Sequence, residues 1–545
     1  MTKKSRDTRH LKIIFFAAIT LFALFLLAPM LLILSKSFIG KDGFTLSFYS
    51  QIMTSGKLGE AFFNSVSVSA LSAIVTTILA FWLAYTINYT NVHPKIKGGI
   101  KTLTVVPMLL PTITYGFAII YSFGKQGLLT MIFGRQLFDI YSVHGLMLGY
   151  VIYTLPVSFL LINNTMGYID KKFMIVSRAM GDSAFKNFTT TIIRPLLGTF
   201  AASFIQSFTL CFTDYGIPTS VGGNMNLVAN LLYTQMLGSI PNFNTGSAVA
   251  ISMLIPSIVS IALLTYIGKY NIRYNKISQI ELTKNKFRDI SCTIFSCGTL
   301  VCILSIFAVI FVVPFVEQWP YKIIPTLDNV RKIFADQAII NVYKNSLFVA
   351  ILSAIVGTLL VYATALVSAR NNKIKIFGRI IDAIALVSNT IPGMVIGVAY
   401  LLTFSGTPLQ NTFGLIIISN VIHFFSSPYL IMKNSLEKLN SSWETTARLM
   451  GDSWLKTVIR IITPNATSSL LEVFSYYFVN SMVTVSAVIF IAGARTMVIT
   501  AKIKELQHFA NFNEIFVLSI LILTTNLVAK GLFKLLSNKK IKLKN

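Results

Sequence analysis

Residues 64–79 read NSVSVSALSAIVTTIL, and residues 345–360 read NSLFVAILSAIVGTLL. Neither copy contains a charged residue. The chain of 545 residues that contains them is 54% hydrophobic and only 12% charged, with a mean hydropathy of +0.70. A soluble protein carries about 25% charged residues. Because so few charges do not cover a water-facing surface, the composition predicts an all-α integral membrane protein.

Apolar runs of about 20 residues, the length that crosses a bilayer as a helix, recur along the chain. The third and ninth runs contain prolines that interrupt them, Pro111 and Pro392. Together the runs predict twelve membrane spans, near 11–34, 62–88, 102–123, 143–165, 197–215, 248–268, 291–315, 346–368, 380–404, 412–432, 466–492 and 513–536.

The net charge of +27 is distributed unevenly along the chain. Cytoplasmic loops of membrane proteins carry an excess of lysine and arginine. We therefore expect both termini on the cytoplasmic side of the plasma (inner) membrane, and we attribute the charge to topology rather than to nucleic-acid binding. Most of the 46 lysines and arginines fall in the two tails and in the alternate loops 91–101, 171–194, 269–290, 370–379 and 433–460.

The repeated stretch indicates an internal duplication. Pro111 matches Pro392 at the same offset as the two apolar copies. Six spans in each half give both halves the same orientation, which implies a pseudo-two-fold axis along the membrane normal. The predicted domains are a first transmembrane half (1–268), a basic cytoplasmic linker (269–290) and a second transmembrane half (291–545).

A polar phrase is also repeated. SRAMGDSAFKNF begins at Ser177 and ARLMGDSWLKTV begins at Ala447, in both cases in the loop after the fourth span of a half. Glycine permits a sharp turn, and Asp and Ser are good helix N-caps, so each phrase predicts a helix–Gly–helix element at the membrane surface. Two such elements, each with an apolar face, favour docking of a two-fold partner.

These loops resemble the cytoplasmic loops of permease subunits of binding-protein-dependent ABC importers, which have the form EAA-xxx-G and end in I-x-L-P. Residues 174–195 read MIVSRAMGDSAFKNFTTTIIRP, and residues 444–464 read ETTARLMGDSWLKTVIRIITP. Glu444 lies one place before the family's acidic position, and the first copy has Ile175 there. The resemblance implies a MetI-like permease fold, in the branch where two halves are fused in one chain.

In that family the loop holds a coupling helix that docks into a cleft of an ATPase. The resemblance therefore implies a transport subunit that is not itself an enzyme and holds no metal or cofactor, with ATP and magnesium bound by a homodimeric ATP-binding subunit. The sequence accordingly lacks a G-x-x-x-x-G-K-[ST] phosphate loop. The implied coupling residues are Arg178, Gly181, Asp182, Phe185 and Pro195 in the first loop, and Glu444, Ala447, Arg448, Gly451, Asp452, Trp454 and Pro464 in the second.

The resemblance also implies an extracytoplasmic binding protein that delivers a small solute. "FTDYGIPTSVGG" (212–223) resembles ferric-iron permeases, and "VNSMVTVSAVIFIAG" (479–493) resembles 2-aminoethylphosphonate permeases. We expect 2-aminoethylphosphonate as the solute, with ferric iron or thiamine as alternatives and an ion-gradient-driven secondary transporter as the alternative of another class. The landing site of the binding protein is expected on the outer loops 35–61, 125–142, 216–247, 316–345 and 493–512.

Polar residues at membrane depth are hypotheses for the translocation pathway. Asp214 either lines the pathway or caps a helix end, and Glu472 and His423 either line it or pair with each other. Broken helices mark transport sites in some transporters, although a proline kink more often serves packing. The pathway candidates are Asp214, Tyr215, Thr484, Glu472, His423, Pro111 and Pro392.

Overall fold

The structure is a computed structural model that describes residues 3–40, 42–54, 56–223, 225–268, 285–370 and 375–542. Two short antiparallel hairpins are the only sheets among these residues, and each follows the first span of its half. The predicted linker 269–290 lies mostly outside the described residues, and its last residues already belong to a helix that begins at Lys286. All other regular structure is helical.

The elements of the first half end with the helix that precedes residue 269. In order they are α1 (Lys3–Phe22), η1 (Ala23–Leu27), α2 (Ala28–Phe38), β1 (Ile39–Gly40), β2 (Gly43–Phe44), α3 (Ser47–Thr54), α4 (Lys57–Tyr89), α5 (Pro94–Leu103), η2 (Val106–Leu109), α6 (Thr112–Phe123), α7 (Leu128–Phe133), α8 (Val143–Gly167), α9 (Lys172–Ala179), α10 (Ala184–Phe188), η3 (Thr189–Ile193), α11 (Arg194–Thr213), α12 (Gly216–Val221), α13 (Val228–Leu237) and α14 (Phe243–Gly268).

The second half repeats this order with shorter connections at one end. Its elements are α15 (Lys286–Val312), η4 (Val313–Phe315), β3 (Val316–Gln318), β4 (Lys322–Pro325), α16 (Asp328–Ala335), α17 (Gln337–Ala369), α18 (Lys375–Thr390), α19 (Gly393–Phe404), α20 (Phe413–His423), α21 (Ser426–Lys438), α22 (Ser442–Leu449), α23 (Trp454–Thr457), η5 (Val458–Ile462), α24 (Thr463–Val483), α25 (Val488–Ile491), η6 (Ala494–Thr496), α26 (Ile499–His508) and α27 (Phe512–Lys542).

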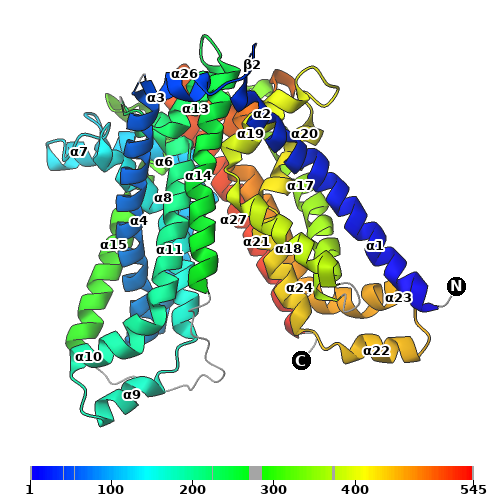
Figure 1. Cartoon of the computed structure of the whole chain (residues 1–545). Coiled ribbons are helices and arrows are strands. Elements are labelled where there is room, and N and C mark those ends of the chain that lie inside the picture. Colours follow the sequence, from blue (N-terminus) through cyan, green and yellow to red (C-terminus); the bar gives the residue numbers. More distant parts are fainter. Residues whose placement is uncertain are drawn as a thin grey trace.

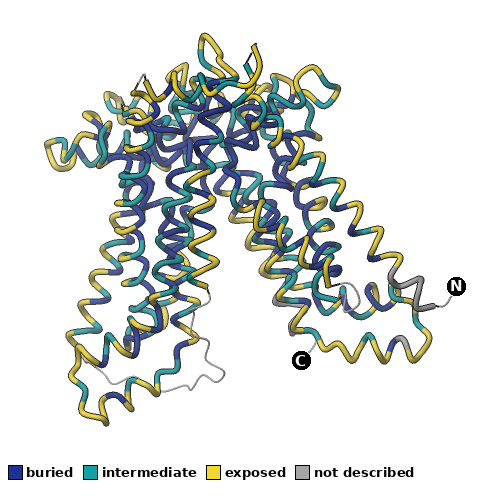
Figure 2. Tube along the Cα trace, viewed as in Figure 1, coloured by how far each residue is buried: buried dark blue, intermediate teal, exposed yellow. Residues whose placement is uncertain are grey.

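The helices form two legs that meet at one end and diverge toward the other (Figure 1). One leg contains α4, α8, α11, α14 and α15, and the other contains α1, α17, α18, α21 and α24. The short helices α9 and α10 lie at the free end of one leg, and α22 and α23 lie at the free end of the other. Buried residues concentrate where the legs meet, which we call the closed end (Figure 2).

The halves exchange their first spans. α2 of the first half packs against α19 of the second, and α15 of the second half packs against α6 of the first. The Tyr400 hydroxyl donates a hydrogen bond to the carbonyl of Phe25 (2.6 Å), and the Ser122 hydroxyl donates one to the carbonyl of Ile306 (3.0 Å). The acceptors Phe25 and Ile306 are separated by the repeat offset of the two apolar copies, whereas the donors Tyr400 and Ser122 are not at matched positions. Both halves therefore use the same acceptor position in the exchange, with different donors.

The described residues contain nine helices that are long and apolar enough to cross a membrane, or up to eleven if each of two bent pairs is one span. The pairs are α18 with α19, bent by 98°, and α20 with α21, bent by 57°. The span predicted near 466–492 is α24, which is absent from this count. Because it carries polar groups such as Glu472 and Asn480 along its length, α24 is less apolar than the other spans.

The matched prolines break the third span in both halves. Pro111 and Pro392 each immediately precede a twelve-residue helix, α6 or α19, and have extended backbone. A proline has no N–H for the helical ladder and disfavours the α conformation in the residue before it. The predicted spans 102–123 and 380–404 are therefore divided at the proline, as the sequence indicates. In the first half the candidate membrane span at this position is Thr112–Phe133.

Candidate functional site

The two repeated phrases fold into the same helix–turn–helix, which we call loop 1 (174–195) and loop 2 (444–464). Gly181 and Gly451 have φ angles of +84° and +86°, a left-handed conformation that glycine adopts without steric cost. The turn is closed by the Asp182 amide, which donates to the Ser177 carbonyl (3.1 Å), and by the Asp452 amide, which donates to the Ala447 carbonyl (2.9 Å).

The remaining shared residues start the second helix of each loop. The Ser183 hydroxyl accepts a hydrogen bond from the Lys186 amide, and Ser453 does the same for Lys456. The same lysines form salt bridges with Asp182 and Asp452, one turn away. The hydrogen bond from Lys186, together with one from the Ser177 hydroxyl (2.8 Å), holds the pKa of the Asp182 carboxyl below its usual value. The Gly, Asp, Ser and Lys shared by the two phrases thus have the same structural roles in both loops.

Each loop presents exposed apolar side chains at the free end of its leg. Met180 and Met450 are 78% and 80% exposed, and Phe185 and its counterpart Leu455 are also exposed. Trp454, predicted to share this apolar face, is instead half-buried and stacks on His10 of α1 with ring centroids 6.3 Å apart. Arg178 is exposed, whereas the Arg448 side chain is outside the described part of the chain.

A π-helical turn precedes the proline of each loop. η3 leads into Pro195 and η5 leads into Pro464, and each proline occupies the first turn of the following long helix. Proline removes one rung of the helical ladder and its ring displaces the preceding carbonyl, which accounts for the wider turn. The prolines therefore join the loops to α11 and α24, the helices that run toward the closed end.

The loops differ in how they are braced against their legs. Nε of Arg370, at the end of α17, lies 3.5 Å from Oε1 of Glu444. In loop 1 the position of Glu444 is taken by Met174, whose carbonyl accepts a hydrogen bond from the Asn187 side chain (2.8 Å). Loop 2 is therefore tied to a spanning helix by an ion pair, whereas the bond seen in loop 1 joins its two helices to each other.

A polar cavity of about 190 Å³ lies between the two halves. Asp214, His423 and Pro392, three of the predicted pathway residues, line it together with Tyr153 and Tyr476. No lysine or arginine is among the described residues that line the cavity. The other lining residues are Gln206, Thr209, Leu210, Thr213, Ser257, Ile261, Leu264, Ser388, Asn389, Thr390, Ile391, Gly393, Phe424, Ser426, Ser427 and Ser486.

Asp214 combines both roles considered for it. Its carboxylate accepts a hydrogen bond from the Ile217 amide (2.8 Å), which caps α12, while the residue also borders the cavity. His423 does not pair with Glu472. Its buried Nδ1 has no hydrogen-bond partner in the described structure, and Glu472 is exposed. Glu472 precedes Tyr476 by four residues on α24, so the two share a helix face and Glu472 lies one turn nearer the free end.

Three other pathway candidates do not line the cavity. Tyr215 is fully buried against Tyr233, with ring centroids 5.0 Å apart. Thr484 ends α24, and Pro111 precedes α6. Sequence reasoning missed Gln206, Tyr153 and Tyr476. The offset of 270 between the twin phrases relates Gln206 to Tyr476, so this pair was detectable as matched polar positions on the fifth span of each half.

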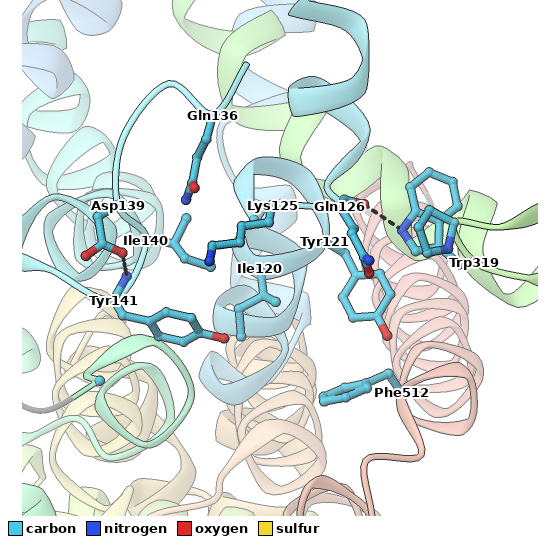
Figure 3. A pocket seen from close by; sticks show the side chains of 13 residues that line it. Ile120, Tyr121, Lys125, Gln126, Gln136, Asp139, Ile140, Tyr141, Trp319 and Phe512 are labelled. Carbon is cyan, nitrogen blue, oxygen red and sulfur yellow. Dashed lines mark hydrogen bonds between the residues drawn. The ribbon is translucent and has the colours of Figure 1, made fainter. Parts of the chain in front are cut away.

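A second, wider pocket of about 980 Å³ opens at the closed end (Figure 3). Lys125, Asp139 and Tyr141 line it from the connection between α6 and α8, and Trp319 reaches it from the hairpin β3–β4. The indole of Trp319 donates to the Gln126 carbonyl (3.2 Å). These residues belong to two of the outer loops predicted to receive a binding protein.

The sequence of the chain matches a known protein family in two segments, one in each half. Residues 76–273 and 361–542 each match the family described as "Binding-protein-dependent transport system inner membrane component". The chain is 24% identical to the "Putative ferric transport system permease protein FbpB 1" of Haemophilus influenzae, over 88% of this chain and 78% of that one. It is 24% identical to the ferric transport system permease protein FbpB of Actinobacillus pleuropneumoniae, over 89% of this chain and 72% of that one.

Another relative matches only one part of the chain. The molybdate/tungstate transport system permease protein WtpB of Pyrococcus furiosus is 28% identical over 34% of this chain and 72% of its own length. The two ferric relatives therefore span both halves, whereas this one spans about a third of the chain.

Proposed function

This chain belongs to the family of binding-protein-dependent transport system inner membrane components and is a permease of an ABC importer; from this premise we propose that its solute is ferric iron. The observation that carries the proposal is the cavity between the halves. It contains the Asp214 carboxylate, the His423 imidazole and the Tyr153 and Tyr476 phenols, without a lysine or arginine among its described lining residues. Hard oxygen ligands suit a highly charged cation.

The same cavity argues against 2-aminoethylphosphonate, the solute favoured by the resemblance of residues 479–493. A phosphonate group carries negative oxygens, and proteins recognise such groups with arginine, lysine or clustered amides. The two relatives that cover most of the chain carry ferric names, and neither name mentions a phosphonate. Family membership likewise gives no support to an ion-gradient-driven transporter.

We infer that loops 1 and 2 are the docking sites of a homodimeric ATP-binding subunit on the cytoplasmic side. The exposed Met180 and Phe185 of loop 1, and Met450 and Leu455 of loop 2, provide apolar anchors of the kind that fill a cleft in a partner. Both α1 and α27 have their terminal ends on the side of the free ends of the legs (Figure 1). This supports cytoplasmic termini in an inner-membrane protein.

The arrangement of the legs suggests how the transport step proceeds. With the legs apart at the loops, the hydrogen bonds between α12 and α26 hold the two halves together at the opposite end. Closure of the ATPase dimer on ATP would draw the loops together, and opening of the closed end would then admit ferric iron from a binding protein. ATP and magnesium would be held by the partner, and this chain would supply the path.

The test is reconstitution of the chain with its ATPase and its binding protein in liposomes. We expect ATP-dependent uptake of ferric iron that competes with neither 2-aminoethylphosphonate nor thiamine. Uptake of phosphonate without uptake of iron, under the same conditions, would overturn the proposed solute while leaving the permease assignment intact.

A further inference from the structure

Lys504 of α26 is a deeply buried lysine at the closed end, with 7% of its surface exposed. Its ammonium donates hydrogen bonds to the Thr219 hydroxyl of the first half (2.6 Å) and to the Gln507 side chain of its own helix (2.8 Å). The Gln507 amide donates in turn to the Thr219 carbonyl (2.9 Å). Two of these three hydrogen bonds, both to Thr219, thus join α26 of one half to α12 of the other.

Aromatic rings complete this seam between the halves. Nζ of Lys504 lies 5.7 Å from the ring centroids of both Tyr215 and Tyr233, within the range of a cation–π contact. Tyr233 also packs against Phe490 of α25, with centroids 6.2 Å apart. Tyr215 directly follows Asp214, which lines the central cavity, so the seam lies next to the cavity on its closed side.

The seam lies at the pseudo-two-fold axis. The amide that begins α13 donates to Ser65, and the amide that begins α26 donates to Ser346 in the same way. This equivalence relates Tyr233 to Lys504, five residues further along each helix. Figure 1 shows α13 and α26 together at the closed end. The lysine therefore contacts its own symmetry counterpart, which places both residues where the two halves part on opening.

The ammonium has no counter-ion within the described structure. Burial alone lowers the pKa of Lys504 to about 8, and no neighbouring carboxylate contributes. The titratable groups that face it are Tyr215 and Tyr233, while Lys502 and Glu505 on its own helix pair with each other (2.7 Å). An unpaired buried charge opposes burial, and the hydrogen bonds and rings offset this cost only in part.

We propose that Lys504 controls the opening of the seam, which acts as the outer gate of the permease. Its hydrogen bond to Thr219 helps to hold the seam closed, and its unneutralised charge favours reopening of the seam when the legs close. In the open state the ammonium is hydrated, so opening recovers its hydration. A neutral side chain of similar volume would keep the seam packed and remove this bias. The proposal concerns the gate and does not depend on which solute passes.

The experiment follows the seam directly in the complex of the chain with its ATPase in lipid nanodiscs. Spin labels are attached to Thr234→Cys on α13 and His508→Cys on α26, in a chain whose four native cysteines are serine. Their separation is measured after trapping with ATP and vanadate, without solute. The open fraction is the share of molecules in which the two labels have moved apart. We expect Lys504→Met to lower this fraction at least fivefold at pH 7. Lys504→Arg should retain opening, and Lys502→Met is the matched control.

The pH profile gives a second, independent readout on the wild-type residue. Below pH 8 Lys504 is protonated whether the seam is open or closed. The whole free-energy cost of burying the ammonium then opposes closure of the seam. Between pH 8 and the ordinary lysine value of 10.5 the closed state loses its proton first, so the open fraction should fall as pH rises. An open fraction that is independent of pH in the wild type, or unchanged in Lys504→Met, would overturn the proposal. If Lys504→Met does not fold, the wild-type profile still decides.

Discussion

Nε of Arg370 lies 3.5 Å from Oε1 of Glu444, and this ion pair ties loop 2 to the end of α17. The repeat offsets relate these residues to Tyr89 and Met174 in the first half, which cannot form an ion pair. Instead, Lys171 lies over the Tyr89 ring, 5.6 Å from its centroid. The two docking loops therefore have the same fold but different braces, and the halves are mechanically unequal.

Removal of one partner of this pair should loosen loop 2. Arg370 is almost fully buried and Glu444 is partly exposed, so Arg370→Ala should cost about 2 kcal/mol of local stability. We expect ATP-dependent transport to fall about tenfold while the chain still inserts in the membrane. The matched variant in loop 1, Asn187→Ala, should have the smaller effect. Equal losses in both variants would show that the ion pair is not the stronger brace.

The turn glycines should be sensitive to any side chain. A Cβ at Gly181 meets no atom within 4 Å, so the cost of Gly181→Ala comes from the left-handed backbone alone, about 1 kcal/mol. Gly451 has the same left-handed backbone, so Gly451→Ala carries the same backbone cost. We expect the double variant to retain ATPase binding but to transport less per ATP hydrolysed. Gly98→Ala, in helix α5 with equally open surroundings, is the control and should transport normally.

The exposed apolar residues of the loops should decide ATPase binding. Phe185→Glu and Leu455→Glu place a charge on a surface proposed to enter an apolar cleft, and burying such a charge is costly. We expect each to weaken co-purification of the ATPase at least tenfold, and the pair to abolish it. Phe287→Glu, at an exposed position that begins α15 outside both loops, should leave the complex intact. An undiminished complex in the double variant would contradict docking at these residues.

Substitution of Asp214 should separate its structural role from its role in the path. Asp214→Asn keeps an oxygen that accepts from the Ile217 amide but removes the charge, so the fold should persist while iron uptake falls at least tenfold. Asp214→Leu also removes the cap of α12 and should cost a further ~1 kcal/mol of stability. Thermal unfolding and uptake are measured on both. Normal iron uptake by Asp214→Asn would exclude this carboxylate from the path.

Features encoded in short stretches were predictable from the sequence. The duplicated apolar runs, the paired prolines and the glycine turns of both loops appear at the expected positions, because hydrophobicity and backbone preference act locally. Of the two alternatives considered for His423 and Glu472, the structure does not contain the pairing, and His423 lines the cavity. A pairing requires the two residues to lie at the same level, whereas Glu472 lies one turn of α24 nearer the free end than Tyr476, which shares the cavity with His423.

The sequence by itself determined that the chain is a duplicated membrane protein with two equivalent loops on one side. These properties follow from composition, repeat offset and charge placement, and none requires knowledge of how helices pack. The tertiary structure alone decided that the halves exchange their first spans, that Asp214, His423 and Tyr476 share one cavity, and that Lys504 closes the seam onto Thr219. Each of these contacts joins residues far apart in the chain, and their proximity depends on how the faces of two helices fit together.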